Sequence, residues 1–125
     1  MRLKNVLLVV KDIEVSKSFY KDLFGLQVLT DFGSKVIMSE GLVLQAQKEW
    51  EKAALKEVSF GSHSSELYFE EYDLDTFVKK LETSKYPISY ATPFGECQGE
   101  KLVRLYDPDL HLIEVKECAL STFTE

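Results

Sequence analysis

The chain has 125 residues, of which 45% are hydrophobic and 29% charged, so it can form one compact soluble domain with a proper core. Its net charge of -6 argues against nucleic acid as a partner, because phosphate binding needs a basic surface. No apolar run approaches the ~20 residues that span a bilayer, and Cys97 and Cys118 lack metal or redox spacing, so we expect free thiols in a cytoplasmic protein.

The first half of the chain predicts one strand, one helix and three further strands. The apolar run NVLLVV (5–10) is the first strand. Asp12 is placed to cap a helix near 13–24, and Gly25 is placed to end it. Three more strands follow in LQVLTDF (26–32), KVIMS (35–39) and LVLQAQ (42–47), separated by glycine and polar residues.

The second half repeats this order. A strand at 66–71 precedes a helix near 74–83 that Asp73 caps, and ISYAT, KLVRLY and HLIEVKE supply three more strands. An internal repeat of this kind indicates two packed copies of one small motif. We expect an α+β fold in which two βαβββ modules form one cup-shaped mixed sheet. The expected single domain covers 1–125, with module 1 at approximately 1–47, a linker at 48–63 with about one helical turn around Trp50, and module 2 at 64–119.

The repeat also predicts which polar residues share a face. Sliding the sequence by 61 residues places Asn5 on Glu66, and the ends of the two halves, LVLQ and HLIE, place Gln45 over Glu114. Side chains alternate between the two faces of a strand, so each polar residue lies opposite the apolar row that meets the helices. A lone carboxylate such as Glu114 is costly to bury in the apolar strand HLIEV, so we expect it to face a concave binding site.

The motifs together resemble the vicinal-oxygen-chelate superfamily, which includes glyoxalase I, bleomycin-resistance proteins, fosfomycin-resistance enzymes and extradiol dioxygenases. The segments that show this resemblance are VLLVVKDIEVSKSFYKDLFGLQV, ELYFEEYDLDTFVKKL and VRLYDPDLHLIEV. The resemblance implies a divalent metal held by the first and last strands of each module, at Asn5, Gln45, Glu66 and Glu114. Oxygen ligands favour hard ions such as Mg²⁺, Mn²⁺ or Ca²⁺, with Ni²⁺ and Zn²⁺ as further candidates, and two neutral amides predict a weak site that is often empty.

Two functions compete at this stage. One is a metal-dependent lyase or isomerase of the glyoxalase I type, with Glu114 or Glu66 as the catalytic base. The alternative is a metal-free binding protein that sequesters a small molecule, as in the bleomycin-resistance branch. A dioxygenase fits less well, because non-haem iron wants two histidines and one carboxylate. The ligand set leaves the choice between enzyme and binding protein open.

The expected ligand contacts come from one arginine and several aromatic residues. Arg104 either holds an anionic group of the ligand or pairs with Glu100 or Asp107 at the surface. The other expected binding residues are Trp50, Tyr68, Phe94 and Tyr106. We expect residues 92–100, rich in glycine and proline, to form a loop that acts as a lid, and His63 to lie in a surface loop. Exposed strand edges predict a homodimer.

Overall fold

The computed structural model describes residues 1–97 and 99–119, although the side chain of Cys97 lies outside this part. The chain divides into a first unit, Met1–Phe60, and a second unit that begins at Gly61. Each unit has its own four-stranded sheet. Within the described residues, no helix has the length and apolar character needed to cross a membrane.

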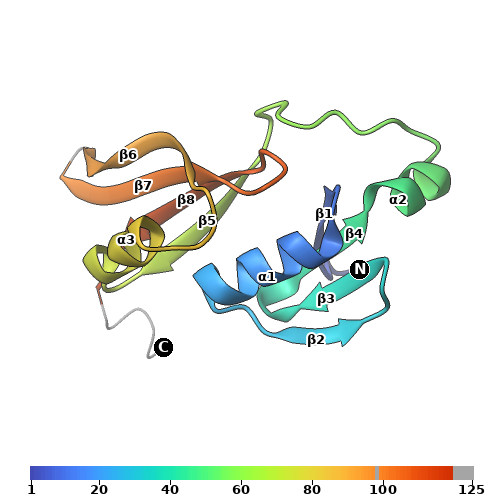
Figure 1. Cartoon of the computed structure of the whole chain (residues 1–125), viewed down its shortest axis with the longest axis horizontal. Helices are drawn as coiled ribbons and strands as arrows, with labels where there is room; N and C mark the ends of the chain where they lie inside the picture. The colour runs from blue at the N-terminus through green and yellow to red at the C-terminus, as the bar shows by residue number, and fades with distance from the viewer. Residues whose placement is uncertain (98, 120–125) are drawn as a thin grey trace. The chain divides into compact units, whose positions relative to one another are not determined.

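The first unit contains β1 (Val6–Val10), α1 (Ile13–Phe24), β2 (Val28–Asp31), β3 (Lys35–Met38), the short 3-10 turn η1 (Ser39–Gly41), β4 (Leu42–Ala46) and α2 (Gln47–Ala54). The strand order is β1-β4-β3-β2 (Figure 1). The β1–β4 pair is parallel and the other pairs are antiparallel. Leu8, Val10 and Leu44 form the buried row of this sheet.

The second unit contains β5 (Glu66–Glu71), α3 (Leu74–Glu82), β6 (Ser89–Cys97), β7 (Glu100–Tyr106) and β8 (Leu112–Glu117). Its strand order, β5-β8-β7-β6, repeats that of the first sheet, and β5 pairs with β8 in parallel. Helix α3 packs on β7 and β8. The βαβββ order of both units confirms the α+β fold of two repeated modules that the sequence predicts.

The predicted helix boundaries are confirmed by their capping contacts. The side chain of Asp12 accepts hydrogen bonds from the backbone N–H groups of Glu14 and Val15, at 3.1 and 3.3 Å. Gly25 ends α1 with a left-handed φ of 69°. Asp73 caps α3 in the same way, accepting from the backbone N–H of Thr76 at 3.2 Å. These contacts satisfy amide groups that have no partner within the helix.

The predicted lid over 92–100 is wrong, because most of this segment is strand. Strand β6 runs to Cys97 and pairs with β7 up to Cys97↔Glu100, and only residue 98 lies outside the described part. The pairing register shifts between Tyr90 and Thr92 and again between Thr92 and Gly95. Bulges of this kind, on an edge strand, accommodate Pro93 without a lost ladder bond. Residues 92–97 therefore extend the β6–β7 hairpin.

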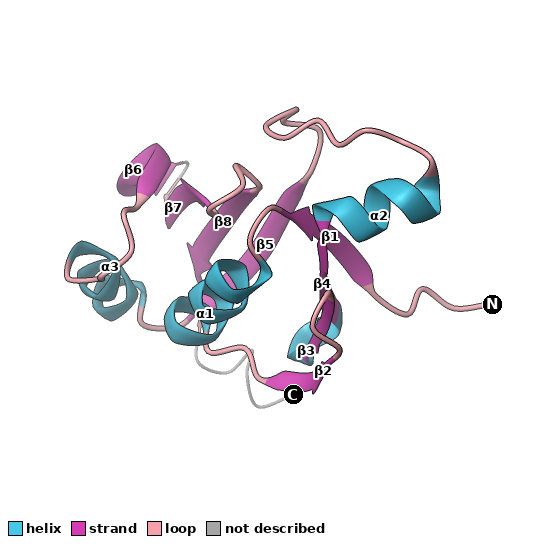
Figure 2. Cartoon of the chain, turned by 45° about the vertical axis from the view of Figure 1, so that its right-hand side comes forward, coloured by secondary structure: helices cyan, strands magenta, loops and turns pink. Residues whose placement is uncertain are grey.

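The segment between the two modules contains more helix than the single turn predicted around Trp50. Helix α2 is eight residues long and ends at Leu55, whose backbone is left-handed. Figure 2 shows α2 directly after β4, followed by the long connection that leads to β5. The module boundaries expected from the sequence stay a prediction.

The turn before β8 carries local backbone strain. The side chain of Asp107 accepts hydrogen bonds from the backbone N–H groups of Asp109 and His111, at 2.8 and 2.9 Å, and fixes the turn. Leu110 takes a left-handed φ of 68°, a conformation that is unfavourable for any residue with a Cβ. Its side chain is 49% exposed, so little apolar burial offsets that strain.

Replacing Leu110 by glycine should therefore stabilise the protein. Strain relief outweighs the entropy that glycine adds to the unfolded chain, and we expect a gain of about 0.5 kcal/mol in the free energy of unfolding. Leu110→Ala is the control, since it removes the same side chain and keeps the strain. Urea unfolding of both variants is the measurement. A glycine variant no more stable than the alanine variant would contradict a strained turn.

Candidate functional site

One face of the second sheet brings together most of the predicted site residues of this unit. The pairing places Glu66 opposite Leu112, and Tyr106 opposite Leu112 from the other side. Tyr68 and Arg104 flank Glu114 in the same way. Directly paired residues point to the same side of a sheet. We call this the polar face, and it comprises Glu66, Tyr68, Glu70, Leu102, Arg104, Tyr106, Leu112, Glu114 and Lys116.

The centre of the polar face is an ion pair. Glu114 is only 7% exposed, and one oxygen of its carboxylate lies 2.6 Å from a terminal nitrogen of Arg104. The Arg104 side chain keeps 32% of its surface exposed. A short bond between two charged groups is among the stronger hydrogen bonds in proteins. Arg104 thus balances the buried charge of Glu114 from the neighbouring strand, instead of pairing with Glu100 or Asp107.

Glu66 is the second carboxylate in this cluster. Partial burial raises the pKa of Glu66, and the neighbouring charge of Glu114 raises it further, while Arg104 partly opposes both effects. A side-chain hydrogen bond with Glu114 also favours the protonated form. Glu66 is an exposed residue, so solvent weakens each of these effects. The two carboxyl groups and one guanidinium leave this cluster with one negative charge in excess when Glu66 is ionised.

The opposite end of the polar face holds a second pair. Lys116 lies 2.9 Å from the carboxylate of Glu100, and it also hydrogen-bonds with the hydroxyl of Tyr68. The bond to Glu100, followed by that to Tyr68, raises the pKa of Lys116. Its positive charge is therefore already matched by Glu100.

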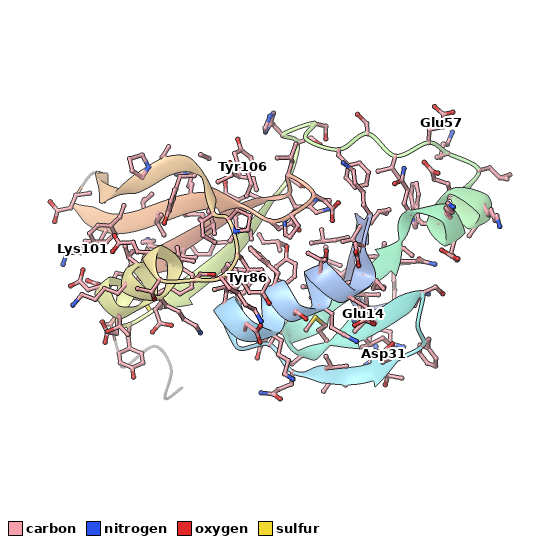
Figure 3. The ribbon with its side chains drawn as sticks, viewed as in Figure 1. Glu14, Asp31, Glu57, Tyr86, Lys101 and Tyr106 are labelled. Carbon is pink, nitrogen blue, oxygen red and sulfur yellow. The ribbon has the colours of Figure 1, made fainter. Side chains whose placement is uncertain are left out.

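His63 is a residue of this region that the sequence analysis placed in a surface loop. Its ring packs edge-on against Tyr106, with ring centres 5.8 Å apart and planes at 61°. Figure 3 shows Tyr106 and Lys101 at opposite ends of β7, which places the ring contact at the Tyr106 end. The sequence places His63 just before the strand of Glu66, from where it could turn toward the site, but only the loop geometry decides where its side chain lies.

The first unit holds the remaining two predicted metal ligands, Asn5 and Gln45. Gln45 pairs with Val9, and Asn5 precedes the first residue of β1. Val9 lies four positions after Asn5, or ~13 Å at the rise of a strand. Within this unit the two amides are therefore not neighbours.

The strand ladders also correct the repeat alignment at the last strand of each module. Leu7 pairs with Val43, whereas Tyr68 pairs with Glu114. Since the slide by 61 places Leu7 on Tyr68, the counterpart of Glu114 is Val43 and not Gln45. A shift of two residues keeps the same face, so alternation alone could not detect it.

The other two predicted ligand contacts lie outside the polar face. Trp50 is a half-buried residue of α2 in the first unit. Phe94 lies in the irregular part of β6 and is 38% exposed. Their assignment as binding residues stays a prediction.

A shallow, open depression of about 410 Å³ lies on the first unit, around α2 and the residues that follow it. It contains none of the predicted site residues. Its lining is Lys48, Glu51, Lys52, Leu55, Lys56 and Glu57. Three lysines face two glutamates there, with one apolar side chain, so it offers little for the orientation of a ligand. The polar face has the more specific chemistry.

The donors of the second unit do not fit a divalent metal as they stand. Arg104 already neutralises the carboxylate of Glu114, and that carboxyl group also contacts Glu66. A cation bound there would have to displace the guanidinium. Taken one unit at a time, the described residues contain no group of three histidine, cysteine, aspartate or glutamate side chains arranged around a metal position. The four-residue metal site stays a prediction that this ion pair argues against.

The pKa shift of Glu66 predicts a pH dependence of stability. A carboxyl whose pKa is higher in the folded protein stabilises that state below the unfolded value, near 4.5, and this contribution disappears as the pH rises through the folded pKa. Glu66→Gln should therefore gain stability relative to the unmodified protein as the pH rises from about 4 to neutrality.

Thermal unfolding at several pH values measures this difference. Glu82→Gln, an exposed change on α3, is the control and should show no such trend. A stability difference between Glu66→Gln and the unmodified protein that is the same at all pH values would contradict the raised pKa.

Comparisons with known proteins agree with this architecture. Residues 3–120 match the family described as Glyoxalase-like domain. A protein of unknown function from Agrobacterium tumefaciens is 34% identical, with a TM-score of 0.80 and 94% of each chain covered. A lactoylglutathione lyase from the same organism is 24% identical, with a TM-score of 0.66 and 90% of each chain covered.

A more distant structure is the fosfomycin resistance protein FosX from Mesorhizobium loti. It is 12% identical, with a TM-score of 0.68, over 97% of this chain and 95% of its own. These last two likenesses describe the fold alone. None of the curated proteins matches the sequence. The family match over nearly the whole chain, with the repeated βαβββ order, shows that the protein belongs to the glyoxalase-like family of the vicinal-oxygen-chelate superfamily.

Proposed function

We propose that this protein binds a small organic molecule on the polar face of the second unit, without a metal ion at Glu114. The observation that carries the proposal is the 2.6 Å ion pair between Arg104 and Glu114. It places a fixed cation on the carboxylate that a metal would otherwise use. The bleomycin-resistance alternative of the sequence analysis is therefore favoured over metal-assisted isomerisation.

The surroundings of the ion pair supply the other features of a ligand site. Tyr106 and Leu112 are half-buried and Tyr68 is 54% exposed, so apolar and aromatic surface adjoins the charged centre. Ligand sites typically combine such surface with a few polar groups that fix orientation. The Arg104 side chain, which is 32% exposed, and the Glu66 carboxyl are polar groups available here.

One observation favours a second function, a proton-transfer enzyme of the glyoxalase I type. The pKa of Glu66 is raised, first by burial and then by Glu114, which brings it closer to that of an effective base at neutral pH. In that case Glu66 would take the proton, beside the ion pair of Arg104 and Glu114. A divalent metal, if bound, would supply the polarisation of the substrate oxygens. The homodimer and the cytoplasmic location stay predictions.

A fragment screen by two-dimensional NMR tests the binding proposal. Protein treated with a chelator should bind some fragments, with the largest amide shifts at Tyr106, Leu112 and Glu114. Binding should persist without added metal, because Arg104 occupies the Glu114 carboxylate that a metal would use. Glu114→Gln keeps the side-chain shape but leaves Arg104 without its partner, so we expect a loss of stability of about 3 kcal/mol, and the same spectra check that the variant is folded.

Two results would contradict the proposal. The first is fragment binding that requires Mg²⁺, Mn²⁺, Ni²⁺ or Zn²⁺ and is lost in Glu114→Gln. The second is lactoylglutathione lyase activity that appears only with one of these metals and depends on Glu66 and Glu114. Either result would favour the metal-assisted enzyme.

A further inference from the structure

The Glu66 end of the polar face combines three kinds of group. Leu112 pairs with Glu66 on one side and with Tyr106 on the other, so these three side chains are neighbours on one face. His63 extends the aromatic surface, because its ring meets that of Tyr106 at 5.8 Å. A carboxylate, an apolar floor and an aromatic edge therefore adjoin one another.

The charges at this end do not cancel. Arg104 is committed to Glu114, and Lys116 is committed to Glu100 at the opposite end of the face. Glu66 is exposed and contacts a second carboxyl group, which leaves its negative charge in excess once it is ionised. A cationic group from a ligand would relieve that repulsion, whereas an anionic group would add to it.

The aromatic neighbours favour the same kind of ligand. The face of a tyrosine ring attracts a cation through its quadrupole, and flat rings pack well against aromatic and leucine side chains. A planar cation such as an amidinium can also make two parallel hydrogen bonds to one carboxylate. The charge and the shape of this end therefore both favour a flat cationic group.

We infer that the Glu66 end of the polar face selects small molecules in which a cationic nitrogen is attached to a flat ring. The inference rests on the function proposed above and adds the ligand class. The cationic group binds the Glu66 carboxylate, and the ring lies over Leu112 beside Tyr106 and His63. The ion pair of Arg104 and Glu114 lies next to this subsite on the same face of the sheet.

Three probes of nearly equal shape test the inference: benzamidine, benzamide and benzoate, which are cationic, neutral and anionic at neutral pH. Each is titrated into the full chain and followed by amide chemical shifts. We expect benzamidine to bind roughly tenfold more tightly than benzoate, as one charge-assisted contact allows. Glu66→Gln should remove this preference, and Tyr106→Leu should weaken all three probes.

Glu82→Gln is the matched control, because it removes one exposed carboxylate from α3 and should leave the preference unchanged. Benzoate binding as tightly as benzamidine at Tyr106 and Leu112, or a preference that survives Glu66→Gln in folded protein, would overturn the ligand class and leave small-molecule binding intact. If none of the three probes shifts the amide signals of Tyr106 and Leu112, the proposed function is overturned as well.

Discussion

The ion pair between Arg104 and Glu114 is the constraint on which the chemistry of this protein depends. A carboxylate as buried as Glu114, at 7% exposure, is stable only with a partner. Removal of one partner from such a pair typically costs about 3–5 kcal/mol, and the 32% exposure of the Arg104 side chain places this pair toward the lower end. The pair fixes one charge of each sign in the middle of the polar face. The groups around the pair therefore determine which ligands bind.

The two units differ in what their repeated strands carry. In the first unit, the positions that correspond to Tyr68 and Glu114 are Leu7 and Val43, both apolar. In the second unit the polar face carries three carboxylates, an arginine, a lysine and two tyrosines. Each sheet keeps one apolar row for its helix, as packing demands, and only the opposite row is free to vary. At these two positions, polar side chains occur in the second copy of the motif and apolar ones in the first.

The elements of the fold could be predicted because apolar periodicity and capping residues are local signals. Asp12 and Gly25 bound α1 as expected, and alternation placed Glu66 and Glu114 on the same face of the second sheet. The predicted lid was wrong because Pro93 and Gly95 read as loop residues, although a bulged edge strand tolerates both.

The details of the site depended on the pairing of strands, which the sequence did not determine. Arg104 was expected to hold a ligand anion or to pair with Glu100 or Asp107, until the β7–β8 register placed it beside Glu114, and the His63 contact arises from a loop. The most direct test of the account is a crystal structure of the protein grown with MnCl₂, with an anomalous difference map. The account predicts the Arg104 guanidinium on the Glu114 carboxylate and no manganese peak there. A manganese ion bound directly to Glu114, at ~2.0–2.6 Å, with Arg104 turned away, would contradict it.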